Sequence, residues 1–196
     1  MKLSPKSLII GVIFVALILG YYYYLTNLNV KKVDDNDKLG KVDMVITENL
    51  DRNYPKTPRE LIKFYTSIQK CYYNEEYEEE DLEKMADQAR KLFDEELLAE
   101  NPYDQFLKNL KTEVASYHTD GKTLNVTIPD TKDIVMWEDG TQKLAYVPCT
   151  YYVREGASYS TSFQTYVCRK DADGNWKILG WLSGGVPEEV REREAA

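Results

Sequence analysis

Residues 143–169, KLAYVPCTYYVREGASYSTSFQTYVCR, alternate between two sets of side chains with a period of two. This period indicates two strands, over 143–154 and 159–169. The Glu155-Gly156 pair between them is typical of a tight hairpin turn. The stretch therefore predicts an antiparallel hairpin, and we expect one side of it to pack on helices.

Further hairpin signals lie on both sides of this stretch, at Asp120-Gly121, Asp139-Gly140 and Asp173-Gly174. Short connections of this kind join strands that are consecutive in the chain and antiparallel. The sequence predicts a curved antiparallel sheet of about four strands, at 122–137 with an interruption at Pro129, 143–154, 159–169 and 175–182.

Upstream of the strands, the apolar period changes to that of helices. Thr57-Pro58-Arg59-Glu60 has the composition of a capping box, with a proline at the first helical position, and predicts a helix over about 58–73. The acidic stretch 75–81 precedes a second helix, where negative charge suits the helix N-terminus. Asn101 and Pro102 predict the cap and the first residue of a third. The fold class is therefore α+β, with three helices packed on the sheet.

An uncharged run, residues 8–25, follows Lys2 and Lys6 near the N-terminus. As a helix it would be about 27 Å long, close to the hydrocarbon thickness of a membrane, with Tyr21–Tyr24 in the headgroup layer. The alternative is a cleaved secretory signal, because the strictly apolar core has only twelve residues. Small residues are not placed for cleavage near Gly20, so we interpret 8–25 as an uncleaved transmembrane signal-anchor.

The two lysines before this run predict a cytoplasmic N-terminal stub, residues 1–7, and an extracellular remainder. Lys31 and Lys32 on the far side oppose this orientation. We expect a single-pass protein of the cell membrane, held in the membrane through residues 8–25.

Three segments follow the anchor. We interpret 26–56 as a juxtamembrane stalk, 57–184 as the folded domain and 185–196 as a charged, frayed tail. The second half of the stalk has apolar residues at helical spacing, which predicts a short helix packed on the domain. These residues are Val42, Val45, Ile46 and Leu50.

The closing hairpin, residues 168–181 with the sequence CRKDADGNWKILGW, carries a Gly-x-Trp-x-Ile pattern on its terminal strand. This pattern resembles the last turn and strand of the nuclear transport factor 2-like superfamily, also called SnoaL-like or cystatin-like. The resemblance covers residues 57–184 and implies a sheet that wraps a long helix into an open cone. It transfers no catalytic residue. Together with the anchor, the chain also resembles uncharacterised single-pass membrane proteins of Gram-positive Firmicutes.

The chain is acidic, with a net formal charge of −8. From residue 26 onward it has 23 Lys and Arg against 33 Asp and Glu, a net charge of −10. A nucleic-acid partner is therefore not expected. With a single histidine and no paired cysteines, neither a zinc or iron site nor a cofactor is expected. We interpret Asp171, Asp173 and Asn175 as a turn rather than a calcium loop.

His118 is a weak catalytic candidate, because enzymes of the resembled superfamily use Asp or His inside the cone. The alternative is a histidine that interacts with the C-terminal end of a helix dipole. Aromatic side chains are the other candidates, because tyrosine-lined clefts suit glycans and peptides. We take Tyr65, Tyr117, Tyr151 and Trp181 as candidate ligand-binding residues, with core packing as the alternative.

The three cysteines do not suggest a disulfide framework. In the predicted hairpin, Cys149 faces about Gln164 and Cys168 faces about Ala145, which is too far apart for a bond between the two sulfurs. Cys71 could meet one of them, or all three could be buried thiols.

The sequence thus favours a non-enzymatic, membrane-tethered extracellular domain that binds a protein or a cell-envelope component. The alternative is a tethered SnoaL-like enzyme or small-ligand receptor that uses the cavity of the cone. A filled or an open interior distinguishes the two.

Overall fold

The computed structural model describes residues 40–194, and residues 1–39 and 195–196, which include the predicted anchor at 8–25, lie outside the described part. Its helices are α2 (Lys41–Ile46), α3 (Pro58–Asn74), α4 (Glu79–Lys91), α5 (Glu95–Glu100), α6 (Tyr103–Thr119) and α7 (Glu188–Glu194). Its strands are β1 (Lys122–Thr127), β2 (Val135–Asp139), β3 (Gln142–Glu155), β4 (Ser158–Lys170) and β5 (Trp176–Ser183).

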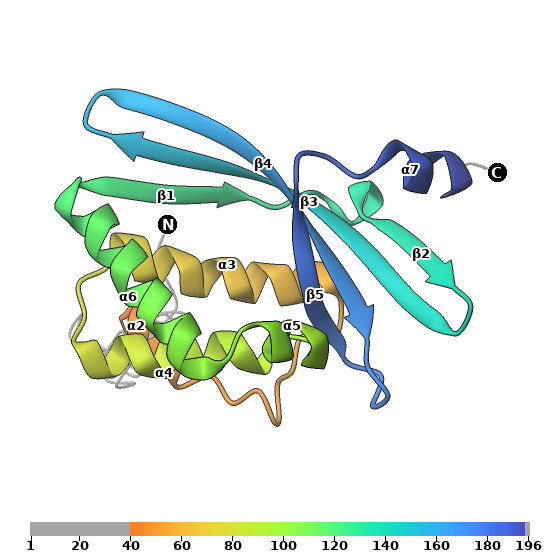
Figure 1. The fold of residues 1–196 in the computed structure, drawn as a ribbon, viewed down its shortest axis with the longest axis horizontal. Helices are drawn as coiled ribbons and strands as arrows, with labels where there is room; N and C mark the ends of the chain where they lie inside the picture. The colour runs from red at the N-terminus through yellow and green to blue at the C-terminus, as the bar shows by residue number, and fades with distance from the viewer. Residues whose placement is uncertain (1–39, 195–196) are drawn as a thin grey trace, which may run out of the picture. The chain divides into compact units, whose positions relative to one another are not determined.

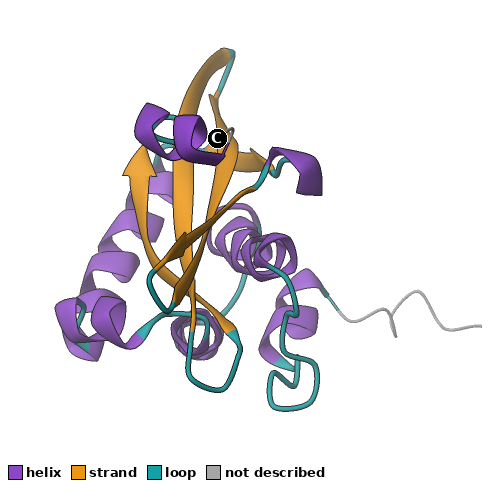
Figure 2. Ribbon diagram, turned by 90° about the vertical axis from the view of Figure 1, so that its right-hand side faces the viewer, coloured by secondary structure: helices purple, strands orange, loops and turns teal. Residues whose placement is uncertain are grey.

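The fold is α+β, with an antiparallel five-stranded sheet in the order β1-β3-β4-β5 and β2 paired with β3 beyond β1. Helix α3 lies along one face of the sheet and contacts β1, β3 and β5 (Figure 1). We call this the inner face. Helix α7 contacts β2 and lies near the opposite, outer face (Figure 2). In the described part, no helix is both long and apolar enough to cross a membrane.

The start of α3 has the predicted capping box. Thr57 Oγ1 accepts a hydrogen bond from the backbone N–H of Glu60, and Glu60 Oε2 accepts one from the N–H of Thr57. The start of α6 differs from the prediction: Pro102 is the cap and the helix begins at Tyr103. Asn101 instead closes the short helix α5, where its Nδ2 donates to the Leu97 carbonyl at 2.9 Å.

The sheet has five strands because the predicted strand at 122–137 is two. A turn of 3-10 helix, Thr131–Asp133, follows Pro129 and separates β1 from β2. Both strands then pair with different halves of the long strand β3. The predicted register between β3 and β4 is confirmed, with Cys149 opposite Gln164 and Ala145 opposite Cys168.

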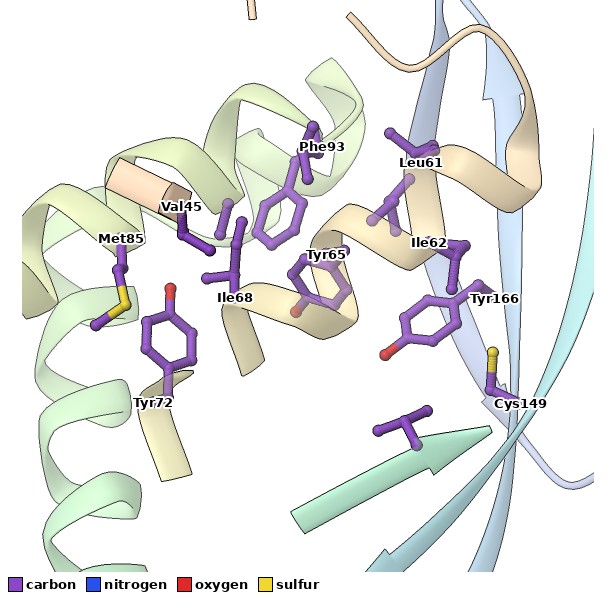
Figure 3. Close-up of a cluster of buried hydrophobic side chains, with 14 of the residues drawn as sticks. Val45, Leu61, Ile62, Tyr65, Ile68, Tyr72, Met85, Phe93, Cys149 and Tyr166 are labelled. Atoms are coloured by element: carbon purple, nitrogen blue, oxygen red, sulfur yellow. The ribbon is translucent and has the colours of Figure 1, made fainter. Parts of the chain in front are cut away.

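The space between α3 and the inner face is filled by side chains (Figure 3). Leu61, Ile62 and Ile68 of α3 are fully buried, and they meet fully buried residues of α4 and of the strands. Burial of large apolar side chains contributes roughly 1.5–3 kcal/mol each, so this layer dominates the stability of the fold. The other fully buried residues include Met85, Leu92, Val147, Tyr166 and Ile178.

Helix α2 is the short helix predicted in the second half of the stalk, and Val45 buries its side chain against the core. Gln88 of α4 holds the C-terminal end of α2. Its Nε2 lies 3.3, 3.1 and 2.8 Å from the carbonyl oxygens of Val45, Ile46 and Glu48. The Val45 carbonyl also accepts from the Glu48 N–H at 3.4 Å. The Gln88 amide adds a side-chain donor for the carbonyls of Ile46 and Glu48, at the end of the helix and just beyond it.

Gln88→Leu is expected to lower the free energy of unfolding by about 1–3 kcal/mol, because the carbonyls of Ile46 and Glu48 lose their side-chain donor. Urea unfolding followed by circular dichroism measures the change. Gln105→Leu is the matched control, since Gln105 is exposed and bonds only to Asn109. Equal unfolding midpoints for Gln88→Leu and Gln105→Leu would show that α2 does not depend on Gln88.

The C-terminal tail is not frayed over its described length, contrary to prediction. Val186 is 7% exposed, and α7 contacts β2. The single apolar residue Val186, just before the charged helix, attaches the segment to the sheet. The high charge of the tail led to the prediction that it is frayed.

Candidate protein-binding surface

Tyr65 and Tyr151, two of the candidate ligand-binding residues, lie in the core rather than in a cleft. Tyr151 Oη donates to Gln69 Oε1 at 2.8 Å and forms a hydrogen bond with Tyr166 Oη. The Tyr65 ring packs edge-on against the Tyr166 ring at 5.7 Å. Burial raises the pKa of all three phenols. These tyrosines therefore hold α3 to the sheet, and they fill the interior that an open cone would use for a ligand.

Of the other two candidates, Tyr117 lies apart from this cluster and Trp181 lies at its margin. Tyr117 on α6 is half-buried, with its ring 4.3 Å from that of Tyr73. Trp181 on β5 is about half exposed, and its ring touches the edge of the Tyr166 ring at 6.3 Å. Two cavities on the surface of the domain are lined by other residues and by none of the four candidates.

His118 lies in the last turn of α6, as the helix-terminal interpretation expects. Its Nε2 is 2.9 Å from the carbonyl oxygen of Tyr72, which can only accept, so this nitrogen carries the proton. The imidazole also contacts the Tyr77 ring edge-on. The histidine thus connects α6 to the end of α3 and does not face the interior.

In the described part of the chain, the acidic residues at the start of α4 and in the β4–β5 turn have structural roles. Glu79, Glu80 and Asp81 form the first turn of α4, where they face the positive end of the helix dipole. Asp171 accepts hydrogen bonds from the backbone N–H groups of Asn175 and Gly174, which closes a turn. Within residues 40–194, no group of three or more His, Cys, Asp or Glu is placed to hold a metal ion.

The larger cavity, about 1010 Å³, lies between the α4–α5 connection and the β4–β5 hairpin. An ion pair dominates its wall: Asp94 accepts from Arg169 Nε at 3.0 Å, and Arg169 Nη1 also donates to Glu96 at 2.8 Å. The Asp94 side chain is 5% exposed and that of Arg169 is 17%. Asp94 also caps α5 by accepting from the N–H of Glu96. The hydrogen bonds of Asp94 join α5 to β4, so the role of this carboxylate in the cavity wall is structural.

This ion pair is not predictable from the sequence, because Asp94 and Arg169 are 75 residues apart. Neither residue has a distinctive local pattern. The only hint was an aspartate directly before a helix, which favours a cap and does not identify a partner.

The most distinctive surface is apolar and lies on the outer face of the sheet. Its four members are Tyr152 (41% exposed), Tyr159 (72%), Phe163 (61%) and Leu182 (40%), and we call them the outer-face patch. They share this face because their cross-strand partners are Thr161, Arg154, Thr150 and Thr165, respectively. The patch crosses β3, β4 and β5 on the side away from α3.

The part of β4 that carries the patch reverses the usual alternation of a half-buried strand. Its inner-face residues Ser160 and Ser162 are small and polar, whereas Tyr159 and Phe163 point outward. In Figure 1, β1 lies between this hairpin and α3, so the helices do not reach the inner side of the β4 segment. Ser160 and Ser162 are exposed as well, so both faces are open to solvent here and the large apolar side chains lie on the outer one. Large apolar side chains gathered on an exposed face are typical of interaction sites.

The three cysteines are free, buried thiols rather than disulfide partners. Burial raises the pKa of Cys71 to about 11 and of Cys149 to about 12. The pKa of Cys168 is raised further for the same reason. A raised pKa keeps the folded thiol protonated and unreactive at neutral pH.

We therefore expect the folded protein to resist Ellman's reagent at pH 8 and to lose stability in alkali. Above pH 9, an unfolded thiol releases its proton while the folded one keeps it, so unfolding becomes easier as pH rises. The free energy of unfolding should fall by about 1.4 kcal/mol per pH unit for each such thiol between pH 9 and 11. Urea midpoints at pH 8 and 10 test this. Stoichiometric labelling at pH 8 without denaturant, or equal midpoints, would contradict it.

Comparison with curated proteins finds no match. Among solved structures, the chain is similar to the crystal structure of the intermembrane space region of the chloroplast protein ARC6, with 14% identity and a TM-score of 0.35 over 69% of this chain and 99% of that one. A similarity this low supports no functional argument. A family model described as Domain of unknown function (DUF6715) matches residues 1–181, and the chain therefore belongs to this family.

Proposed function

We propose that this chain is a membrane-tethered interaction domain that binds a protein, or a protein component of the cell envelope, through the outer-face patch. The observation that carries the proposal is the exposure of four large apolar side chains on one sheet face. Large exposed apolar patches mark interaction sites more often than chance positions on a surface. Tyrosine and phenylalanine are also enriched at the centres of protein interfaces.

The tether belongs to the same proposal. Residues 8–25 would cross the membrane once, with the N-terminus in the cytoplasm and the domain outside. The support comes from the sequence: an uncharged run of the required length that follows two lysines. A cysteine-accessibility assay on a cysteine placed at Ala196 tests the orientation. Labelling by a membrane-impermeant maleimide in intact cells is expected, and labelling only after lysis would overturn it.

The enzymatic alternative has less support. Tyr65 and Tyr151 pack in the core, and His118 donates to a backbone carbonyl. We also propose that the domain is a filled variant of the nuclear transport factor 2-like cone. Support comes from the long helix α3 across the inner face and from Trp176 and Ile178, which are buried on the terminal strand as the Gly-x-Trp-x-Ile pattern suggests.

Site-specific photo-crosslinking in cells that produce the full chain tests the binding surface. A benzoylphenylalanine at Phe163 is expected to give a discrete adduct that is lost when Tyr159 and Leu182 are changed to serine. The same crosslinker at Tyr103, an exposed aromatic on α6, is the control. No adduct at Phe163, or the same adducts from both positions, would overturn the proposal.

A further inference from the structure

The edges of the sheet differ in whether their outward backbone N–H and C=O groups have hydrogen-bond partners. At β1, the side chain of Asn74 acts as a substitute strand: its Nδ2 donates to the Leu124 carbonyl and its Oδ1 accepts from the Leu124 N–H, both at 2.7 Å. Lys70 Nζ covers the next carbonyl on that side, that of Val126, at 3.3 Å. Residues of α3 therefore occupy the hydrogen-bonding groups of the β1 edge.

The edge of β5 is partly occupied as well. Ile178 donates to the Leu92 carbonyl and accepts from the Asp94 N–H, both at 2.8 Å, so the segment after α4 runs beside β5. Strand β2 contacts α7 and carries Glu138. Covering elements and charged side chains are the devices that keep strand edges from pairing with other chains.

The distal part of β4 has no covering element on its open edge and no charged residue of its own, and the nearby Arg154 of β3 lies over the face of the Tyr159 ring, 5.7 Å from its centroid. Its pairing with β5 begins at Gln164, and Gly184, at a φ of +97°, turns the chain away. The last contact on this side is the hydrogen bond from the Gly184 N–H to the Phe163 carbonyl, at 2.8 Å. Because backbone groups alternate sides along a strand, those of Thr161 and Tyr159 point the same way. No strand of residues 40–194 pairs with them there.

The side chains of this segment favour pairing. Residues 158–163 contain no charge and no proline, and all six are exposed. Tyrosine, threonine and phenylalanine have high strand propensity. Pairing with β3 already holds this segment in an extended conformation. A partner that binds the open edge therefore does not have to order the backbone of β4, which removes one entropic cost of binding.

We propose that an extended segment of a partner protein adds to the sheet as a new strand along the open β4 edge, at residues 158–162. This rests on the proposed function, and it specifies how the partner binds. Backbone hydrogen bonds to Tyr159 and Thr161 supply affinity, and alternate apolar side chains of the segment lie beside Tyr159 and Phe163 on the outer face.

The net charge of the domain favours an unrelated partner over a second copy of this chain as the occupant of the open edge. Residues 40–194 carry 20 Lys and Arg against 30 Asp and Glu, a net formal charge of −10, so two copies repel each other. A segment that lacks acidic residues and has Lys or Arg at its flanks complements the acidic domain.

A phage-displayed library of random dodecapeptides, selected on the full chain in detergent micelles, provides the probe. Enriched peptides are expected to alternate apolar residues and to lack Asp and Glu. Thr161→Pro removes the N–H on the open side and leaves the hydrogen bonds to β3, so it should weaken peptide binding at least about tenfold. Thr161→Val keeps the N–H and should bind within about twofold of the wild type. Thermal unfolding checks that both variants fold.

Hydrogen exchange on the wild-type chain gives a readout that does not depend on the variants. Bound peptide is expected to slow exchange at the amides of Tyr159 and Thr161 and to leave Ser160 and Ser162 unchanged. No enriched peptide, equal binding by Thr161→Pro and Thr161→Val, or no protection at Tyr159 and Thr161 would overturn strand addition. Strand addition and the proposed function can fail separately. If strand addition is overturned but peptide binding is lost in Phe163→Ser, or the crosslink at Phe163 persists, the outer-face patch still binds a partner by another mode.

Discussion

Tyr166→Ala is expected to lower the free energy of unfolding by about 3–5 kcal/mol, the range for removing a large aromatic from a packed core. Tyr166 is fully buried and is the largest side chain with no exposed surface in residues 40–194. Its ring contacts those of Tyr65 and Trp181, and its hydroxyl bonds to that of Tyr151. The substitution empties the space between α3 and the sheet, and urea unfolding of the full chain in detergent measures the loss.

Tyr166→Phe is the matched control. It keeps the ring and removes only the hydroxyl, and Tyr151 retains its bond to Gln69 at 2.8 Å. The expected cost is about 1 kcal/mol, the net value of one hydrogen bond. Equal costs for the alanine and phenylalanine variants would mean that the hydroxyl network, and not ring packing, holds α3 to the sheet.

Asp94→Ala is expected to cost a similar amount, about 3–5 kcal/mol, because it leaves a mostly buried guanidinium without its main partner. Arg169 would keep only Glu96, whose side chain is 68% exposed. The substitution also removes the cap of α5, which alone is worth about 1 kcal/mol. The unfolding midpoint in urea and the m-value distinguish a loss of stability from a loss of the α5 segment alone.

Two further variants test whether the cost comes from the unpaired charge. Glu96→Gln should cost less than about 1 kcal/mol, since its pair with Arg169 is exposed on the glutamate side. Asp94→Ala combined with Arg169→Met should be more stable than Asp94→Ala alone, because the uncompensated charge is gone. A double variant as unstable as the single one would assign the cost to the cap and the turn geometry instead.

Features set by neighbouring residues were predictable from the sequence. Thr57 and Glu60 form the capping box because both partners lie within one turn. The register of β3 on β4 followed from a turn whose length is fixed by Gly156. Predictions failed where a second short element competes: Asn101 is an acceptable cap for α6, but the six-residue helix α5 uses it first.

The candidate site was less predictable, for a physical reason. The alternation of Tyr159 and Phe163 with serines identifies two faces, but it does not say which face is covered. That depends on how far α3 extends along the sheet and on β1 lying between them, which are properties of the assembled fold. Tyr65 and Tyr151 are candidates because tyrosine suits both roles. Only the assembled fold shows that the Tyr65 ring is buried and that the Tyr151 hydroxyl bonds to Gln69 in the interior.

The amide of Asn74 has a consequence for stoichiometry. A sheet with open edges on both sides can accept a strand at one edge and offer the other to the next molecule, which is the geometry of a growing fibril. Because Asn74 already satisfies the backbone of Leu124, a strand added at β4 has no counterpart across the sheet at β1. Complexes formed at β4 should therefore stop at one partner for each domain instead of polymerising.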